Sequence, residues 1–507
     1  MMTGGHTNQF QLTLGALLTG LVDLSPEADR TLTGLTLDSR EVQPGDLFLA
    51  CHGRQVDGGA FIDAAIENGA VAVVWESRPG ALAIPLAWRR NAKGGPIPVI
   101  ALENLSQQVG VIADRFYGHP SRALFMTGVT GTNGKTSVSQ FLAHSLSPDA
   151  PCGIIGTLGH GLYRQLQESS HTTPDAVTVQ RWLADLREHG AASVVMEVSS
   201  HALDQGRVNG VAFNCAVFTN LSREHLDYHG DMQSYAKAKA SLFSSPGLQY
   251  AAINVDDAAG RELAASLPDS ITQLRYGLDA SHSPDVLGRR VSLTPDGIDV
   301  DVTTPAGEGS FQARVLGRFN ASNLLAVLAV LLMHGIPLKA ALARLGSVRP
   351  VPGRMETFGG GEKPLVVVDY AHTPDALEQA LRALREHGPV CLWCVFGCGG
   401  DRDAGKRPEM GAIAERLADV VILANDNPRS EDPQAIIDAI RHGMTQPEQV
   451  HSIPDRHAAI NDAIGRARPG DIVLVAGKGH EAWQIIGSEK RPFSDRDVVL
   501  DCLDAWT

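Results

Sequence analysis

Short apolar runs alternate with polar, glycine-rich turns along the chain, and this pattern predicts strands joined by loops and helices. In the first segment, residues 1–110, the apolar runs Asp46–Ala50 and Ala70–Trp75 predict strands. In the second segment, residues 111–348, a strand is expected over Ala123–Gly128 and a helix over Lys135–Ser145. Further strands are expected in that segment at Ala192–Val198, Val211–Phe218 and Tyr250–Asn254. Strands that alternate with helices are typical of a mostly parallel sheet covered by helices.

The third segment, residues 349–507, begins at a proline-rich hinge, Arg349-Pro-Val-Pro-Gly353. A helix is expected from Pro374. Strands are expected at Leu365–Asp369, Val390–Phe396, Val420–Ala424 and Asp471–Ala476. The alternation repeats that of the second segment and predicts a second parallel sheet, of Rossmann-like type. The sequence therefore predicts an α/β protein with three domains.

Composition agrees with this organisation and argues against two classes of protein. A chain of 507 residues suggests roughly two to four domains of about 100–200 residues each. The formal net charge of −14 argues against a nucleic-acid-binding protein, which usually has a basic surface. The longest apolar stretch, near Leu324–Met333, is too short for a membrane span and predicts a buried helix. The first residues lack a basic start followed by an apolar core, so we expect no signal peptide.

Three of the seven cysteines, Cys391, Cys394 and Cys398, are closely spaced and raise the question of a metal site. The first two lie in an apolar run that predicts a buried strand. No second group of cysteines and histidines is spaced to complete a tetrahedral site. Burial as reduced thiols is the favoured interpretation, and reduced thiols suit the cytoplasm.

The strongest chemical signal is the segment Gly128-Val-Thr-Gly-Thr-Asn-Gly-Lys-Thr-Ser137, which follows a predicted strand and opens a predicted helix. Glycines let the backbone wrap phosphate oxygens, and a helix N-terminus favours negative charge. Lys135 would contact the β- and γ-phosphates of a nucleotide, and Thr136 would hold Mg²⁺. The strict P-loop pattern has glycine where Val129 stands. The alternative, an ordinary glycine-rich turn, is disfavoured by the adjacent Gly-Lys-Thr.

The loop Thr130–Thr136 resembles the ATP loop of the Mur ligase family, which allows this variant spacing. Further blocks resemble that family's motifs in order: Met196–Leu203, Thr219–Gly230, Gly317–Asn323, Val351–Arg354 and Asp369–Pro374. The resemblance covers nearly the whole chain and all three segments. It implies an ATP-dependent ligase with a central P-loop-type, mostly parallel sheet with helices on both faces and a C-terminal Rossmann-like domain. In this chemistry ATP phosphorylates a carboxylate, and an amine then attacks the acyl phosphate.

The resemblance assigns the ATP and metal sites residue by residue. The expected ATP-binding residues are Gly131, Thr132, Asn133, Gly134, Lys135, Thr136, Ser137, Asn320, Arg354 and His372. The expected ligands of two Mg²⁺ ions are Thr136, Glu197, His225 and Lys239, and the expected catalytic residues are Lys135, Lys239 and His225. Lys239 is expected to be carbamylated, because a carbamate turns the cation into an anion that suits magnesium. Lys237 is a competitor for this role; Lys239 is favoured because it lies four residues after Tyr235, as in the family.

The same resemblance implies two substrates. The expected binding residues for UDP-N-acetylmuramoyl-L-alanyl-D-glutamate are Leu37, Ser39, Arg54, Gln55, Val56, His171, Thr172, Thr173, Ser199, Gln205 and Arg207. Those for meso-2,6-diaminopimelate are Arg402, Asp426, Asn427, Pro428, Arg429, Gly477 and Glu481. Family members that add diaminopimelate carry the motif Asp-Asn-Pro-Arg, here Asp426–Arg429. Lysine-adding members usually lack its arginine, and an arginine fork suits the extra carboxylate of diaminopimelate.

We therefore expect a cytoplasmic monomer that adds meso-diaminopimelate to the D-glutamate of the UDP-linked dipeptide, with no nucleic-acid partner and no membrane span. Three alternatives stay open at this point. They are a lysine-adding enzyme of the same family, a ligase like folylpolyglutamate synthetase, and an inactive nucleotide-binding regulator. The first segment resembles uridine-nucleotide-binding blocks that folylpolyglutamate synthetase lacks. Retention of Lys135, Glu197, His225 and Lys239 argues against the inactive regulator.

Overall fold

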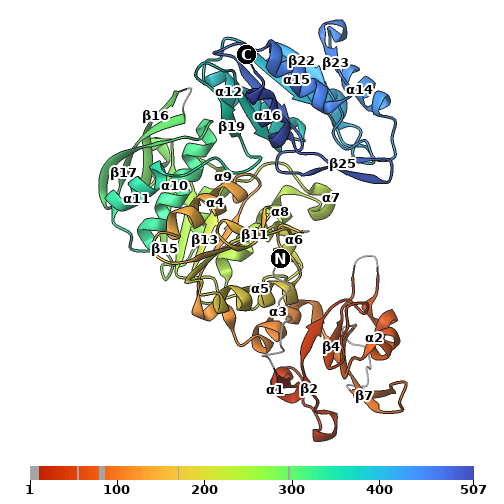
Figure 1. Cartoon of the computed structure of the whole chain (residues 1–507). Helices are drawn as coiled ribbons and strands as arrows, with labels where there is room; N and C mark the ends of the chain where they lie inside the picture. The colour runs from red at the N-terminus through yellow and green to blue at the C-terminus, as the bar shows by residue number, and fades with distance from the viewer. Residues whose placement is uncertain (1–10, 54–55, 79–85, 170, 295–296, 507) are drawn as a thin grey trace. The chain divides into compact units, whose positions relative to one another are not determined.

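The computed structural model describes residues 11–53, 56–78, 86–169, 171–294 and 297–506. The chain divides into two compact units, residues 1–274 and residues 275–507, and each is described by itself. The helices and strands are labelled in chain order in Figure 1.

The first unit begins with a small sheet in the order β3-β4-β5-β7-β6, parallel except for β6. Its strands are β3 (Gly34–Thr36), β4 (Asp46–Ala50), β5 (Ala72–Ser77), β6 (Leu86–Arg90) and β7 (Pro96–Glu103). Every residue of β4 is buried, because Leu47 and Leu49 face one core and Phe48 and Ala50 face the other. A strand that packs on both faces reads as a continuous apolar run. The prediction of a strand at Asp46–Ala50 is therefore confirmed, and the next strand begins two residues later than predicted.

Helices cover both faces of this sheet. Helices α1 (Leu14–Leu18) and α3 (Leu105–Phe116) pack on one face, and α2 (Ile62–Asn68) packs on the other. A two-stranded pair, β1 (Leu12–Thr13) with β2 (Thr31–Leu32), lies beside α1. Helix α3 runs through residue 110, and a Cβ on Gly110 would lie 1.9 Å from the carbonyl oxygen of Asn209. The absence of a side chain at this position lets α3 approach the following part of the unit closely.

A larger sheet forms the rest of the first unit, in the order β11-β10-β9-β12-β8-β13-β14. Its strands are β8 (Phe125–Thr130), β9 (Cys152–Gly156), β10 (Gly159–Leu162), β11 (Gln165–Gln167), β12 (Ser193–Glu197), β13 (Cys215–Phe218) and β14 (Tyr250–Asn254). Strands β9, β12, β8, β13 and β14 are parallel, as predicted for this segment. The predicted strand over Tyr250–Asn254 matches β14, and the others match within a few residues.

Six helices accompany this sheet in the described part of the first unit. They are α4 (Lys135–Leu146), α5 (Ala176–Glu188), α6 (Ser200–Asp204), α7 (Leu226–His229), α8 (Met232–Ala240) and α9 (Ala258–Ser266). Helices α5 and α9 share one hydrophobic core with the strands, through Leu183 and Leu263 for example. Helix α4, predicted over Lys135–Ser145, packs against β9 and β12. Sites form at the carboxyl ends of the strands in open parallel sheets. At these ends, β8 is followed by the glycine-rich loop, and β12 ends on Glu197.

The second unit opens with an antiparallel meander, β16 (Val286–Thr294), β17 (Gly297–Thr304) and β18 (Gly307–Ala313). The end of β15 (Thr272–Gly277) pairs with β16 in parallel. Helices α10 (Arg318–Met333) and α11 (Leu338–Gly346) pack on β16 and β18. The apolar stretch Leu324–Met333 lies within α10 and is mostly buried, as predicted. No helix within the described ranges is long and apolar enough to cross a membrane.

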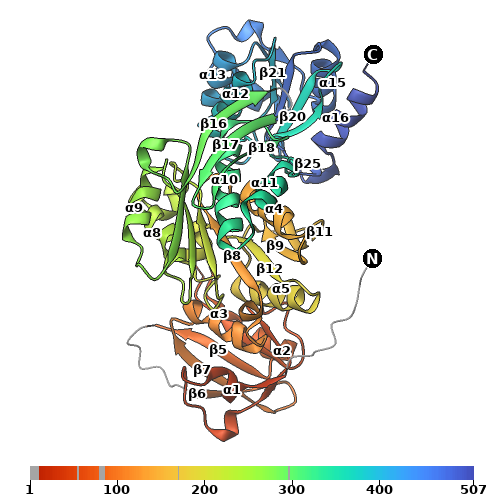
Figure 2. The same ribbon diagram turned by 90° about the vertical axis from the view of Figure 1, so that its left-hand side faces the viewer.

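The C-terminal sheet of the second unit has the order β19-β20-β24-β21-β22-β23, parallel except for β19. Its strands are β19 (Glu356–Gly359), β20 (Leu365–Asp369), β21 (Leu392–Phe396), β22 (Val420–Leu423), β23 (His451–Ser452) and β24 (Ile472–Ala476). Helices α12 (Pro374–Glu386), α13 (Lys406–Leu417) and α14 (Pro433–Arg441) cover one face, and α15 (Arg456–Arg466) and α16 (Asp495–Asp504) cover the other (Figure 2). A hairpin of β25 (Trp483–Ile486) and β26 (Glu489–Pro492) stands apart from the sheet. The predicted Rossmann-like arrangement is thus present.

The cysteines of this region pack as apolar side chains. Cys394 lies in β21 and Cys398 just after it, both buried, and Cys391 is partly buried. Burial raises the pKa of Cys394 and of Cys398 to about 12, so both thiols stay protonated at neutral pH. Among the described residues, no group of three or more His, Cys, Asp or Glu side chains is arranged to hold a metal ion.

Candidate active site

The loop between β8 and α4 owes its shape to glycines. Gly131 has φ 148° and Gly134 has φ 86°, and a Cβ on Gly131 would lie 1.9 Å from Thr219 Oγ1. The Nζ of Lys135, the first residue of α4, donates to the carbonyl oxygens of Gly131 and Thr132, both at 2.8 Å. The N-cap residue of α4, Gly134, has no side chain to cap the first turn, so the backbone N–H groups there are oriented for an anion. The arrangement is that of a phosphate-binding loop.

The residues directly after β13 form hydrogen bonds with the glycine-rich loop between β8 and α4. Thr219 Oγ1 donates to the carbonyl oxygen of Asn133 at 2.5 Å, and the backbone N–H of Asn133 donates to Asn220 Oδ1 at 2.9 Å. Thr132 Oγ1 lies 3.1 Å from the hydroxyl of Tyr235. The sequence did not assign a role to Thr219 or Asn220, although both begin the block Thr219–Gly230 that resembles a family motif. The Thr-Asn pair directly after a predicted strand was the available signal.

Glu197 is the last residue of β12, in the strand next to β8, and it is 1% exposed. Its Oε2 accepts hydrogen bonds from Thr136 Oγ1 at 2.9 Å and Thr157 Oγ1 at 3.0 Å. Its Oε1 accepts one from the backbone N–H of Thr157 at 2.9 Å. A Cβ on Gly156 would lie 2.3 Å from Oε1, so glycine makes room for the carboxylate. The structure thus brings together Thr136 and Glu197, an oxygen pair of the kind that Mg²⁺ prefers.

Lys239 lies on α8 with 1% of its surface exposed, whereas the competing Lys237 is exposed. Its Nζ donates to the carbonyl oxygen of Gly131 at 2.7 Å and lies 4.5 Å from the centre of the Tyr235 ring. Burial, and then the charge of Lys135, lower the pKa of Lys239 to about 6. The lysine that contacts the loop is therefore an uncharged amine at neutral pH, which is the form that reacts with CO₂.

His225, the third expected metal ligand, lies directly before α7 with φ 57°, and its side chain is about half exposed. Its Nε2 lies 3.7 Å from Glu224 Oε2, and its ring centre lies 4.8 Å from that of His201. Burial and the neighbouring His225 and His229 lower the pKa of His201 to about 4. Within the described residues, no hydrogen bond joins His225 to Glu197.

The residues expected to bind the UDP-linked peptide in this unit form a connected hydrogen-bond network. Thr172 Oγ1 lies 3.0 Å from Thr157 Oγ1, and Thr173 Oγ1 donates to the carbonyl oxygen of Glu197 at 2.8 Å. The backbone N–H of Ser199 donates to Thr173 Oγ1 at 3.1 Å. This network begins at the carboxylate of the candidate metal site, so the two sets of predicted residues are adjacent. His171, next in the chain, is exposed.

Arg207 and Gln205 continue the network. Arg207 Nη1 donates to the carbonyl oxygen of Thr173 at 2.9 Å. Its Nε and Nη2 donate to Gln205 Oε1 at 2.9 and 2.6 Å, and Gln205 Nε2 donates to the Tyr228 hydroxyl at 2.8 Å. Burial lowers the pKa of Arg207. A partly buried guanidinium that faces a polar loop is suited to bind a carboxylate or phosphate.

The expected uridine-binding residues of the first sheet give fewer contacts. Leu37 follows β3, and Ser39 is buried with its carbonyl oxygen bonded to Asn68 Nδ2 at 2.8 Å. Val56 is 56% exposed, so its side chain is accessible to a ligand. Arg54 and Gln55 lie outside the described residues.

In the second unit, two of the three expected ATP contacts gather at Tyr370. The guanidinium of Arg354 lies 4.6 Å from the centre of the Tyr370 ring, and His372 Nδ1 lies 2.7 Å from the Tyr370 carbonyl oxygen. Burial lowers the pKa of His372. The third, Asn320, lies in the first turn of α10. Its Nδ2 donates to the carbonyl oxygen of Leu316, just before the helix, at 2.8 Å. Its amide is already used within the helix.

The Asp426–Arg429 motif follows β22 and is attached to the hairpin strand β25. Arg429 has φ 50°, and its backbone N–H donates to the carbonyl oxygen of Ile485 at 3.1 Å. Its Nη1 donates to the carbonyl oxygen of Gly400 at 2.7 Å. A Cβ on Gly399 would lie 3.0 Å from Arg429 Nη1 and 3.8 Å from Arg402 Cγ. The two arginines that sequence analysis assigned to carboxylates therefore flank the same glycine.

The remaining expected diaminopimelate residues meet on the neighbouring loop. Asn427 Nδ2 donates to Glu481 Oε2 at 3.0 Å, and a Cβ on Gly477 would lie 2.6 Å from Asp426 Oδ2. Asp426 is nine-tenths buried, and burial raises its pKa. Pro428 joins these residues to Arg429, and its carbonyl oxygen would lie 1.9 Å from a Cβ on Gly400. The structure thus brings both halves of the predicted set into one place.

Arg456 and Lys478 have fully buried side chains in this region, and the sequence did not mark either of them. Arg456, at the start of α15, donates to Asp495 through Nε at 2.7 Å and through Nη2 at 2.8 Å, and both side chains are fully buried. Its Nη2 also donates to the carbonyl oxygen of Ala476 at 2.9 Å. The second residue, Lys478, lies between the expected site residues Gly477 and Glu481. Lysine and arginine are mostly exposed, so nothing in the sequence pattern marked either one as buried.

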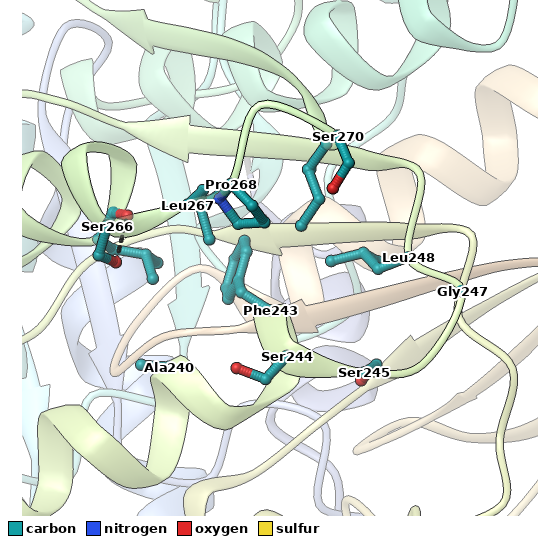
Figure 3. A pocket seen from close by; sticks show the side chains of 12 residues that line it. Ala240, Phe243, Ser244, Ser245, Gly247, Leu248, Ser266, Leu267, Pro268 and Ser270 are labelled. Carbon is teal, nitrogen blue, oxygen red and sulfur yellow. Dashed lines mark hydrogen bonds between the residues drawn. The ribbon is translucent and has the colours of Figure 1, made fainter.

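A separate hollow of about 430 Å³ lies between residues 240–248, at and after the end of α8, and residues 263–271, which link α9 to β15 (Figure 3). Phe243, Leu248 and Leu267 supply apolar walls, and Ser244 and Ser270 are among its polar residues. None of the predicted site residues lines it.

Three family models match the chain in succession. They are described as the Mur ligase family catalytic domain over residues 31–117, the Mur ligase middle domain over residues 129–331, and the Mur ligase glutamate ligase domain over residues 353–479.

Curated relatives match over nearly the full length. A UDP-N-acetylmuramoyl-L-alanyl-D-glutamate–2,6-diaminopimelate ligase of Chromobacterium violaceum is 51% identical, over 96% of this chain and 98% of the relative. The enzyme of the same name from Pseudomonas aeruginosa is also 51% identical, over 96% of this chain and 98% of the relative.

Solved structures of similar fold also match most of the chain. One of a ligase with that name is 36% identical, with a TM-score of 0.71 over 98% of this chain and 99% of the other. The folylpolyglutamate synthase of Mycobacterium tuberculosis, with a TM-score of 0.59 and 20% identity, covers 73% of this chain and shares the fold alone. The chain therefore belongs to the Mur ligase family.

Proposed function

We propose that the protein joins meso-diaminopimelate to the D-glutamate of UDP-N-acetylmuramoyl-L-alanyl-D-glutamate in an ATP-dependent reaction. The observation that carries the proposal is the meeting of Thr136, Glu197 and Lys239 at one phosphate-type loop. The choice of substrates is supported by relatives of that printed name, about half identical over nearly the whole length. The addition of lysine to the same dipeptide and the addition of glutamate to a folate are competing assignments that the experiment below distinguishes.

Residues 131–137 bind the ATP phosphates in this proposal, with Lys135 and the N–H groups of α4 facing the transferred phosphoryl group. Phosphoryl transfer depends mainly on alignment and on neutralising charge, so a fixed lysine and helix terminus supply what the step requires. Asn320, Arg354 and His372 are proposed to contact the nucleotide from the second unit. The phosphoryl group moves to the D-glutamate carboxylate, and the amine of diaminopimelate then displaces phosphate from the acyl phosphate.

Magnesium fits the residues at the carboxyl ends of β8 and β12. The Thr136 hydroxyl and the buried Glu197 carboxylate are both oxygen donors, 2.9 Å apart. When bound, Mg²⁺ would neutralise the phosphate charge. His225 and Lys239 are the proposed ligands of a second ion. An ammonium on Lys239 does not fit a cation site, whereas a carbamate does.

The low pKa of Lys239 supports carbamylation. A free amine attacks the carbon of CO₂ and loses one proton, which leaves a carbamate with two oxygen ligands and one N–H. That N–H can keep the hydrogen bond that Nζ now donates to the Gly131 carbonyl oxygen. Lys237, exposed on the same helix, lacks both the burial and the contact with the loop.

The UDP-linked peptide is proposed to bind along the polar network that starts at Glu197. Thr172, Thr173, Ser199, Gln205 and Arg207 would hold the peptide and its muramoyl group near the phosphoryl donor. His171 would contact the same end. Leu37, Ser39, Arg54, Gln55 and Val56 would hold the uridine end.

Diaminopimelate is proposed to bind between the two arginines and Glu481. Arg402 and Arg429 would receive its carboxylates, and Glu481 with Gly477 would receive the distal ammonium. Asp426, Asn427 and Pro428 would shape the site. L-lysine lacks the distal carboxylate, so a bound lysine would leave an arginine without its partner, which costs affinity.

Three further statements stay predictions. The domain boundaries at residues 110 and 348, the monomeric state and the cytoplasmic location rest on the sequence and the family resemblance.

The test supplies the purified protein with ATP, Mg²⁺ and UDP-N-acetylmuramoyl-L-alanyl-D-glutamate, and compares amino acids by product mass and ADP release. We expect the diaminopimelate adduct, with kcat/KM at least about 100-fold above that for L-lysine. A preference for lysine would overturn the substrate assignment. ADP release only with a folate and glutamate would favour the folate reaction, and no ATP turnover with any acceptor would favour an inactive regulator.

A further inference from the structure

Lys478 has a fully buried side chain in the loop after β24, and the proposed reaction has not used it. It stands between two glycines with positive φ, Gly477 at 119° and Gly479 at 54°. A Cβ on Gly477 would lie 2.6 Å from Asp426 Oδ2, and one on Gly479 would lie 2.8 Å from the carbonyl oxygen of Gly353. The glycines let the loop lie against both neighbours, so that the lysine between them points inward.

The ammonium of Lys478 joins two residues of the proposed amino-acid site. Its Nζ donates to Glu481 Oε2 at 2.9 Å and to Asn427 Oδ1 at 3.2 Å. Asn427 Nδ2 donates to the same Oε2 at 3.0 Å, and Asn427 Oδ1 also accepts from the backbone N–H of Ile485 at 2.9 Å. The three side chains form a closed triangle that is anchored to β25.

This triangle leaves one carboxylate oxygen for a ligand. Oε2 of Glu481 accepts two hydrogen bonds, whereas no donor among the described residues lies on Oε1. The Glu481 side chain is 20% exposed, so it reaches the surface of the site, whereas the Lys478 side chain is fully buried. A carboxylate fixed through one oxygen presents the other in a single direction, which lowers the cost of ordering it when a ligand binds.

We propose that Lys478 is a positioning residue for the incoming amino acid: it holds Glu481 and Asn427 so that Glu481 Oε1 receives the distal ammonium of diaminopimelate. The inference rests on the proposed function, because it concerns the orientation of that substrate. It adds a specificity role to a residue that never touches the substrate itself.

Charge balance favours the same role. The buried carboxylate of Asp426 lies against the loop, and Asp495 is paired with Arg456 behind it. Without Lys478, Glu481 and Asp426 would share the site with one fewer cation. Glu481 would then keep only the hydrogen bond from Asn427 and would turn toward water, because a mostly buried carboxylate without its counter-charge is costly.

The experiment compares two amino acids that differ only at the distal amino group. Diaminopimelate carries it, and 2-aminopimelate has the same carbon chain and both carboxylates without it. Apparent affinities, from KM or from competitive inhibition, are measured for wild type, Lys478→Met and Lys339→Met. Lys339 is exposed on α11 and serves as the matched control.

For Lys478→Met we expect KM for diaminopimelate to rise about 10-fold or more, the loss of one well-oriented charged hydrogen bond. The affinity for 2-aminopimelate and the KM values for ATP and the UDP-linked dipeptide should stay within about 2-fold of wild type. Adding Lys478→Met to Glu481→Gln should cause little further loss for diaminopimelate, because the lysine acts through the glutamate. Lys339→Met should match wild type throughout.

If Lys478→Met weakens the binding of diaminopimelate and 2-aminopimelate equally, the lysine has a structural role only and the inference is overturned. The same holds if the losses of Lys478→Met and Glu481→Gln add fully in the double variant. An unchanged KM for diaminopimelate would also overturn it. If Lys478→Met does not fold, the same comparison is made with Lys478→Gln, which keeps a donor and removes the charge. Failure of the wild-type protein to ligate diaminopimelate at all would instead overturn the proposed function.

Discussion

Replacing Lys239 with methionine should stabilise the first unit, and the gain should shrink as the pH rises. The pKa of Lys239 is about 6 in the folded protein, against 10.5 for an unperturbed lysine. Between these values the unfolded chain binds the proton and the folded chain does not, so folding must release it. The wild-type free energy of unfolding therefore rises with pH through this window, by up to about 1.4 kcal/mol per unit.

The loss of unfolding free energy caused by Lys239 depends on how far the pH lies below the pKa of lysine in the unfolded chain. At pH 8 the lysine costs about 3 kcal/mol of stability, at pH 9.5 about 1 kcal/mol, and above 10.5 nothing. Methionine has a similar length and no charge, and it forfeits only the hydrogen bond to the Gly131 carbonyl oxygen, worth about 1 kcal/mol. Lys135 Nζ also donates to that oxygen, so it is not left unpaired. We expect Lys239→Met to be more stable than wild type by about 2 kcal/mol at pH 8 and to show no gain at pH 9.5.

The assay is equilibrium urea unfolding followed by tryptophan fluorescence, in CO₂-free buffers at pH 8 and 9.5. Lys237→Met provides the matched control, because it removes an exposed lysine two residues away on the same helix. It should leave the pH dependence unchanged. Parallel pH profiles for wild type and Lys239→Met, or an equal shift in both variants, would refute the reasoning that burial keeps Lys239 uncharged.

Four further outcomes are expected. Lys135→Ala should lower kcat/KM by about 100-fold or more with unchanged circular dichroism, and near-normal turnover would remove the ATP-loop assignment. With ¹³C-bicarbonate, wild type should give a protein carbamate signal by NMR that Lys239→Ala lacks, and a signal that persists would place the carbamate elsewhere. Arg429→Ala should raise KM for diaminopimelate about 10-fold or more and leave KM for ATP unchanged; undiminished use would move the specificity elsewhere. Asp495→Asn should lower the stability of the second unit by about 3 kcal/mol or more in urea unfolding, because it leaves Arg456 buried without its counter-charge, and wild-type stability would contradict this.

The sheets could be predicted because their strands are buried on both faces. Tyr250–Asn254 and Leu365–Asp369 are apolar runs of strand length between loops, and both form strands with the predicted bounds. The antiparallel meander β16–β18 was not predicted. Its strands expose one side, as in Gly297–Thr304, where buried and partly exposed residues alternate. That alternation itself indicates a half-buried strand, so the sequence carried a signal for β17 that the search for continuous apolar runs passed over.

The ATP loop could be predicted because its chemistry is local. Gly131, Gly134, Lys135 and Thr136 are close in sequence, and the backbone conformation that they need restricts the residue types. Glu197 lies 61 positions from Thr136, and only the family resemblance connected the two. The parallel pairing of β12 with β8 is the physical link, because it sets the end of one strand beside the start of the loop.

The burial of two lysines could not be predicted from the sequence, and the reason is energetic. A lysine is normally exposed, so Lys239 and Lys478 look like solvated side chains until their surroundings are known. In the structure their environments differ: Lys239 donates to a carbonyl oxygen and is affected by the positive charge of Lys135, whereas Lys478 donates to a carboxylate. The first environment favours an amine that can be modified, and the second favours a cation that holds its partner in place. The same residue type thus serves opposite purposes, and the difference comes from partners that folding brings together.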